Sequence, residues 1–177
     1  MEPLLIVTGP PGAGKSTVAE LVAARLPAPT VLVEGDAFFA FLRAGAIDPW
    51  LPAAHPQNEA VTAAAGATTG RFAASFNTVY DGVLGPWFLD EFLAAAGLAE
   101  ADYAVIVPPV DVCVRRVAER RNHGFTDEPA TRHMHEQFRV AATDPRHVVD
   151  DPTTDASAVA DLILAARAEG RLRWRVQ

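Results

Sequence analysis

The sequence predicts an α/β fold built on a parallel sheet of five strands. Short, wholly apolar runs alternate along the chain with segments of helical periodicity, as expected when parallel strands are buried on both faces. The first apolar run leads into a glycine-rich loop and then into a helix. Because 177 residues suffice for one good core but not for two ordinary ones, we expect a single domain over residues 1–177.

The first half of the chain contains three of the predicted strands, at residues 4–7, 30–34 and 76–80. Apolar residues at helical spacing between positions 18 and 26 predict a first helix, which Pro27 ends. Three prolines in eight residues predict irregular backbone from position 48 to 56. The alanine-rich stretch 57–75 predicts a long helix.

The second half supplies two further strands, at residues 103–107 and 147–149. Helices are predicted at 86–96, where proline occupies an early position, and at 155–168, which is amphipathic. Asp111 is expected to cap a helix that runs to about residue 120, and a shorter helix passes through Met134 and Phe138. We expect the tail, residues 171–175, to be a solvated end.

Residues 9–17, here called the P-loop, follow the first predicted strand. Gly9, Gly14, Lys15 and Ser16 occupy the fixed positions of the phosphate-binding pattern Gly-x4-Gly-Lys-[Ser/Thr]. A strand, a glycine-rich turn and a helix N-terminus together form an anion cradle of backbone N–H groups. The sequence therefore predicts a site for ATP and Mg²⁺. All nine loop residues are expected to hold the nucleotide, namely Gly9, Pro10, Pro11, Gly12, Ala13, Gly14, Lys15, Ser16 and Thr17.

Lys15 and Ser16 have distinct expected roles. Lys15 should reach the β- and γ-phosphates as a catalytic residue, and the Ser16 hydroxyl should ligate Mg²⁺. Lys15 is also the only lysine, since the other fourteen basic residues are arginine. A chain that otherwise uses arginine places a compact ammonium where a phosphate is expected.

Composition excludes several classes of partner. The net charge of −7 argues against a nucleic-acid partner, and no run of about 18 apolar residues predicts a membrane span. The single Cys113 excludes an internal disulfide and is typical of a reducing compartment. We therefore expect a cytoplasmic protein, as a monomer or a homodimer.

Basic residues are unevenly distributed. Between positions 37 and 114 there are two arginines, whereas between 115 and 146 there are seven. The second stretch is therefore suited to phosphates, and the first is poor in the arginines that hold a phosphorylated acceptor. A nucleoside monophosphate acceptor is disfavoured on this ground.

Two aspartates follow predicted strands, at the sheet edge where ligands gather in parallel α/β proteins. Asp36, after the second strand, is the candidate general base for an attacking hydroxyl, with a helix cap as the alternative. Asp81, after the third strand, could hold the water shell of Mg²⁺, bind substrate or cap the turn at Gly82.

Arginines before the polar loop 122–129 are candidates for stabilising the transferred phosphoryl group. Arg116 and Arg120 share a helix face at i, i+4 spacing. Arg120 is the preferred catalytic residue, and stacking near the adenine is the alternative role for Arg116. Arg132 is a weaker candidate. The alternative is a solvated basic face at a helix C-terminus.

Aromatic residues suggest an acceptor with apolar surface, although core packing also explains them. Phe39 is the candidate among them for contacting the acceptor, and Phe38, Trp50 and Trp87 belong to the same group. His55 is a further candidate acceptor residue, and an ordinary loop histidine is the alternative.

These motifs resemble those of the small P-loop kinases: the P-loop, Gly35-Asp36 after the second strand, and the arginine pair before a polar loop. The resemblance implies parallel strand order 2-3-1-4-5, helices on both faces of the sheet, and a small movable lid at about residues 120–133. It covers essentially the whole chain, and the P-loop is its most specific part.

Within that group the chain looks most like the chloramphenicol phosphotransferase-like kinases, through Val33-Glu34-Gly35-Asp36, Val79-Tyr80-Asp81-Gly82 and His147-Val148-Val149-Asp150. In that family the aspartate matching Asp36 is the proposed base for a drug hydroxyl. The segments Arg121-Asn122-His123-Gly124-Phe125 and Glu136-Gln137-Phe138 resemble gluconate kinases.

The resemblance implies an ATP-dependent kinase for a hydroxyl of a small, antibiotic-like molecule. The alternatives are a gluconate- or nucleoside-type metabolite kinase and a regulatory nucleotide-binding ATPase with little transfer activity.

Overall fold

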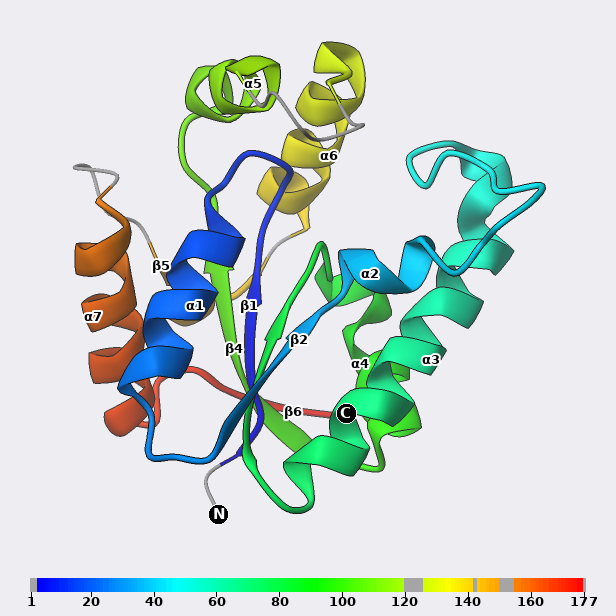
Figure 1. Ribbon diagram of the computed structural model, residues 1–177. Helices are drawn as coiled ribbons and strands as arrows, with labels where there is room; N and C mark the ends of the chain where they lie inside the picture. Colours follow the sequence, from blue (N-terminus) through cyan, green and yellow to red (C-terminus); the bar gives the residue numbers. More distant parts are fainter. Residues whose placement is uncertain (1–2, 120–125, 142, 150–154, 177) are drawn as a thin grey trace.

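A twisted sheet between two layers of helices forms the centre of the computed structural model, which describes residues 3–119, 126–141, 143–149 and 155–176 (Figure 1). Five strands run parallel in the order β2-β3-β1-β4-β5. This confirms the predicted strand order. The strands are β1 (Leu5–Thr8), β2 (Thr30–Glu34), β3 (Asn77–Asp81), β4 (Glu100–Ile106) and β5 (Val148–Val149).

β1 is the central strand and every one of its residues is buried. Its side chains alternate between two cores, because successive residues of a strand point to opposite faces. Leu5 and Val7 pack with α1 (Lys15–Arg25) and α7 (Ala156–Ala168), whereas Ile6 packs with residues of α3 (His55–Ala73) and α4 (Pro86–Ala96). The apolar run that predicted the strand therefore packs against helices on both faces of the sheet.

The remaining helices lie at the carboxyl ends of the strands. α2 (Asp36–Phe39) follows β2 directly, and α5 (Val110–Glu119) and α6 (Glu128–Val140) stand above the sheet, apart from the two covering layers (Figure 1). Two short 3₁₀ turns, η1 (Pro52–Ala54) and η2 (Pro145–His147), complete the described chain. No helix in these described ranges is both long and apolar enough to cross a bilayer.

Two helix starts differ from the prediction. α3 begins at His55, within the stretch expected to be irregular, because proline is tolerated in the first turn, where Pro56 lies. α5 begins at Val110, so Asp111 lies inside the helix instead of capping it. The Asp111 carboxylate pairs with Arg132 of α6 at 3.1 Å. Its role is to join two helices.

The tail is not a solvated end, and this prediction was wrong. Arg173–Arg175 form a sixth strand, β6, which pairs antiparallel with the beginning of β4. Leu172 is fully buried, and the Trp174 indole donates to Asp90 Oδ1 at 3.0 Å. The charged residues that suggested solvation are paired, since Arg173 and Arg175 both contact Glu100.

A buried ion network joins β4, β6 and α7. The Asp102 carboxylate, 1% exposed, accepts hydrogen bonds from Arg173 Nε at 2.9 Å and from Arg167 Nε at 3.1 Å. Arg167 also donates to the Pro3 carbonyl. A buried ion pair contributes little net stability, because the cost of desolvating its charges offsets their attraction. Removing only the carboxylate is nevertheless destabilising, since the buried positive charge then has no balancing group.

We predict that Asp102→Asn lowers the free energy of unfolding by about 3 kcal/mol, because the amide cannot balance the charge of Arg167 and Arg173. Urea denaturation measures the loss. The control is Asp161→Asn, which breaks the exposed pair with Arg25 and should lower stability by less than about 1 kcal/mol. Equal losses in the two variants would contradict the argument.

Candidate active site

The P-loop connects β1 to α1 and rests against α5. Gly12 and Gly14 have φ angles of +79° and +93°, a region that other residues rarely adopt. A Cβ atom built on Gly12 would lie 2.3 Å from the carbonyl oxygen of Cys113 in α5. Glycine therefore serves two purposes here, because it permits the turn and lets α5 contact the loop backbone.

The beginning of α1 is suited to an anion. The helix has no side-chain N-cap and no acidic residue in its first turn, so its N–H groups and positive dipole end are not compensated locally by a carboxylate. Lys15 is the first helical residue, is 8% exposed, and its Nζ donates to the Pro10 carbonyl at 3.1 Å. Ser16, next in the chain, is exposed. These features support the predicted phosphate cradle.

The ends of β2 and β3 bring Asp36 and Asp81 to the same edge of the sheet. The Gly35 N–H donates to the Asp81 carbonyl at 2.7 Å, which ties the two strand ends together. Asp36 begins α2 and is exposed, whereas Asp81 ends β3 and is 6% exposed. The two carboxylates therefore meet different environments.

Burial raises the pKa of Asp81 above its ordinary value of 3.8. A hydrogen bond from Ser16 and the positive charge of Lys15 lower it, while the nearby Asp36 and Glu34 raise it. Its Oδ1 atom is buried and has no hydrogen-bond partner within the described part of the molecule. A desolvated carboxylate oxygen beside the Ser16 hydroxyl is chemically suited to a hard cation.

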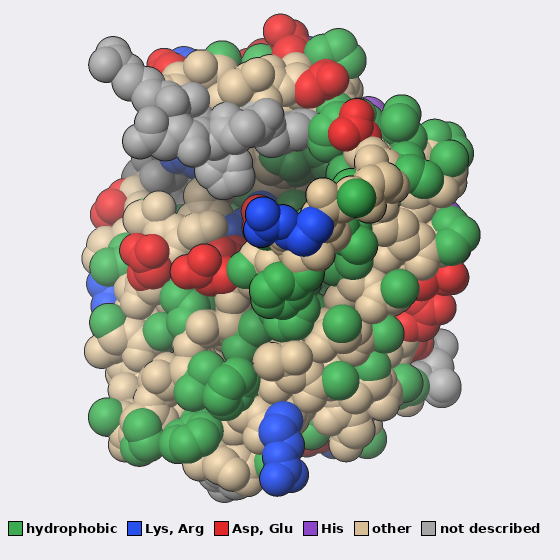
Figure 2. Space-filling view, turned by 45° about the vertical axis from the view of Figure 1, so that its right-hand side comes forward, with side chains coloured by type: hydrophobic (Ala, Val, Ile, Leu, Met, Phe, Trp, Pro, Cys, Tyr) green, Lys and Arg blue, Asp and Glu red, His purple; other side chains and the backbone are tan. Residues whose placement is uncertain are grey.

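A cleft of about 1030 Å³ opens beside the P-loop (Figure 2). Residues from six regions line it: the P-loop, the start of α2, the chain before α3, α3 itself, the β3–α4 region and α6. Its residues are Pro11, Lys15, Ser16, Gly35, Asp36, Phe39, Pro49, Trp50, Leu51, Pro52, His55, Asn58, Val61, Thr62, Ala65, Tyr80, Val83, Trp87, Phe88, His133, Met134, Gln137 and Phe138.

The cleft brings together several of the residues predicted from the sequence. Lys15, Ser16 and Asp36 line it, as do the acceptor candidates Phe39 and His55. The His55 ring stacks on Phe88 with centroids 5.4 Å apart, and its Nε2 lies 3.1 Å from Glu59. Asp81 does not line the cleft, although its carboxylate interacts with Ser16, which does.

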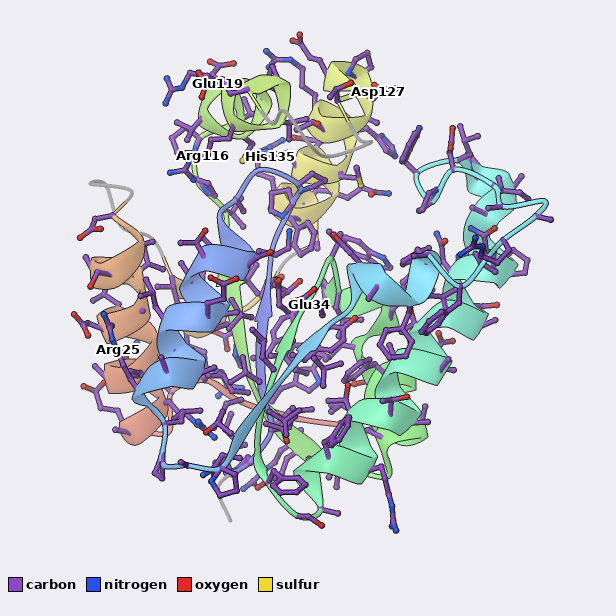
Figure 3. All side chains as sticks on the ribbon, viewed as in Figure 1. Arg25, Glu34, Arg116, Glu119, Asp127 and His135 are labelled. Atoms are coloured by element: carbon purple, nitrogen blue, oxygen red, sulfur yellow. The ribbon has the colours of Figure 1, made fainter. Side chains whose placement is uncertain are left out.

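Among the predicted arginines, Arg116 contacts the P-loop. From α5 its Nη1 donates to the Ala13 carbonyl at 3.3 Å and approaches the Gly12 carbonyl at 3.5 Å (Figure 3). Arg132 points elsewhere, to Glu128 and Asp111. Arg120, the preferred catalytic arginine, and positions 120–125 of the expected lid lie outside the described residues. Positions 128–133 of that lid belong to α6.

Two helices supply cleft residues beyond those predicted from the sequence. α3 supplies Asn58 and Thr62, and α6 supplies His133 and Gln137. None of these residues belongs to a phosphate-binding pattern or follows a strand. Helical spacing, with 58 and 62 or 133 and 137 four residues apart, is the signal that could have grouped them.

The model of the AAA domain family AAA_33 matches residues 4–145. The chain belongs to this family. No curated protein matches it in a sequence search.

Three solved structures share the fold over nearly their whole length. A sugar kinase from Janibacter sp. HTCC2649 has a TM-score of 0.70 at 17% identity, with 95% of each chain covered. The tunicamycin resistance protein of Deinococcus radiodurans gives 0.67 at 19% identity, covering 93% of this chain and 95% of that one. Shikimate kinase from Acinetobacter baumannii, in complex with shikimate, gives 0.66 at 19%, covering 97% and 96%. The architecture is that of a small P-loop kinase.

We predict that Gly12→Ala destabilises the protein more than Gly45→Ala. Both glycines have positive φ angles, so each alanine introduces similar backbone strain, but a Cβ on Gly45 meets no atom within 4 Å. The clash with Cys113 should add about 1–3 kcal/mol to the loss at Gly12. Urea denaturation of both variants gives the difference, and equal losses would show that α5 does not constrain the loop.

We predict that Asp81→Asn raises the free energy of unfolding at pH 7 in the absence of Mg²⁺, because it removes a desolvated charge. A raised pKa means that the folded state binds the proton more readily than the unfolded chain. Stability of the wild type should therefore increase as the pH falls from above the raised value toward 3.8, and the variant should lose this dependence.

The control for Asp81→Asn is Glu20→Gln, which neutralises an exposed carboxylate on α1. Thermal unfolding between pH 4 and 8 measures both. A destabilised Asp81→Asn at pH 7 would contradict the argument.

Proposed function

We propose that the protein is a kinase that uses ATP and Mg²⁺ to phosphorylate a hydroxyl group of a small molecule. The observation that carries the proposal is the shared cleft, which Lys15 and Ser16 line from the P-loop and Asp36 lines from the end of β2. A phosphate cradle and a carboxylate facing the same space are the two parts that phosphoryl transfer to a hydroxyl requires. The likeness to kinases of the same fold supports this function.

The residues of the P-loop would hold the phosphates. Backbone N–H groups and the dipole of α1 favour negative charge at this point, and Lys15 adds a formal positive charge. Arg116, which contacts the loop from α5, and Arg120 complete the basic set in this proposal. Their role is to neutralise charge that develops on the transferred group.

Ser16 and Asp81 are the residues that would hold Mg²⁺. The partnerless buried oxygen of Asp81 fits a cation, and the described residues contain no cluster of three or more side chains able to bind a metal alone. Mg²⁺ is commonly held by one or two protein oxygens together with phosphates and water. When bound, it neutralises charge on the β- and γ-phosphates.

Asp36 is the proposed general base. It is the first residue of α2, is exposed, and lines the cleft. Within hydrogen-bond reach of an acceptor hydroxyl, it would orient the oxygen and take its proton. The aromatic lining of the cleft favours an acceptor with apolar surface, such as an antibiotic-like compound.

The test is transfer from γ-labelled ATP to amphenicols and other antibiotics, gluconate, shikimate, nucleosides and nucleoside monophosphates. We expect a labelled product whose kcat falls about 10²–10⁴-fold in Asp36→Asn, with little change in ATP affinity. Lys15→Ala should weaken ATP binding. Asp48→Asn, in the chain before α3 and outside the cleft lining, serves as the matched control.

Full turnover in Asp36→Asn would contradict its role as base. Tight ATP binding with no labelled product across the panel would contradict the kinase proposal and favour a regulatory nucleotide-binding protein.

A further inference from the structure

α6 turns one face to the cleft. His133, Met134, Gln137 and Phe138 line it, and they lie at the i, i+1, i+4 and i+5 spacing that defines one side of a helix. With 3.6 residues per turn, Arg132 and Arg139 fall on the opposite side. The helix therefore presents an amide, an imidazole and apolar groups to the cleft, and directs its two arginines away from it.

Both arginines of α6 are engaged outside the cleft. Arg132 lies 2.9 Å from Glu128 and 3.1 Å from Asp111 of α5, and the Arg139 Nε donates to Glu136 at 2.6 Å. These carboxylates balance the guanidinium charges away from the acceptor space. Exposed ion pairs are individually weak. Both of these pairs, however, lie on the side of α6 that the helical spacing assigns to the arginines.

The orientation of α6 is fixed by contacts at several points. Phe138 is 3% exposed, and its ring lies edge-on to Trp87 with centroids 5.2 Å apart. His135, also buried, has its Nε2 atom 2.8 Å from the Pro108 carbonyl at the junction of β4 and α5 (Figure 3). Asp127 caps the first turn by accepting from the Ala130 N–H. Rotation of the arginines into the cleft would break these contacts.

Charge in the cleft is correspondingly sparse. Lys15 is the one Lys or Arg among the described lining residues, and it belongs to the P-loop. His55 lies beside the carboxylate of Glu59, which would balance its charge if protonated. A carboxylate or phosphate on the acceptor would find no arginine to pair with among the described residues that line the cleft. Such a charge is unfavourable wherever the bound acceptor is shielded from water.

We propose that Gln137 and His133 are specificity-determining residues that select an uncharged acceptor, by hydrogen bonds to hydroxyl or amide groups at the end remote from the phosphorylated oxygen. The amide both donates and accepts, and the imidazole can do either, so the pair recognises neutral polar groups. This inference rests on the proposed kinase function and adds the class of acceptor.

The test uses matched acceptors that differ in one carboxylate: glucitol with gluconate, and methyl shikimate with shikimate. In any pair that is phosphorylated, wild type should prefer the neutral member by at least about tenfold in kcat/KM. Gln137→Arg should shift that ratio at least about tenfold toward the anion, through KM. Ala67→Arg adds the same charge on an exposed α3 position outside the cleft and should leave the ratio unchanged.

His133→Ala should raise the KM of the neutral acceptor with little change in kcat, and ATP affinity should stay within about twofold in every variant. A wild-type preference for the anionic member, or a ratio that Gln137→Arg leaves unchanged, would overturn the inference and leave the kinase proposal intact. Transfer to no member of any pair, with ATP bound normally, would contradict the kinase proposal itself and remove the basis of this inference.

Discussion

The contact between the P-loop and α5 is the constraint on which the described site depends. The loop backbone at Gly12 lies against the Cys113 backbone, and Arg116 reaches the loop carbonyls from the same helix. α5 is in turn joined to α6 through the Asp111–Arg132 pair, and the Pro108 carbonyl just before α5 contacts His135. The P-loop and the α6 wall of the cleft are thus connected through two helices that pack together.

The parts of this site that the sequence predicts are those whose chemistry is local. The P-loop is a contiguous pattern between a strand and a helix, and Asp36 follows a strand whose apolar run is unmistakable. Phe39 and His55 were expected at the acceptor site and do line the cleft. In each case the residue could be proposed from the residues next to it in the sequence.

The parts that it does not predict arise from tertiary packing. Gln137 lies more than 100 positions after the P-loop, and only the docking of α6 against Trp87 and α5 brings it to the cleft. Arg173 and Arg175 looked solvated because their partners, Glu100 and Asp102, are some 70 residues earlier. Gly70 lies inside α3, where glycine lowers helix propensity, but a Cβ there would lie 2.0 Å from the Ala96 carbonyl oxygen, so the glycine permits close packing on α4.

The placement of the three tryptophans gives the protein built-in optical reporters at two distant places. Trp50 and Trp87 line the cleft, whereas Trp174 lies in β6 and its ring contacts those of Tyr103 and His147. Indole emission is sensitive to its surroundings, so light from the first two follows what enters the cleft, and light from the third follows the integrity of the sheet edge. Replacing Trp174 by phenylalanine separates the two signals, and occupancy of the cleft then becomes visible without any attached dye.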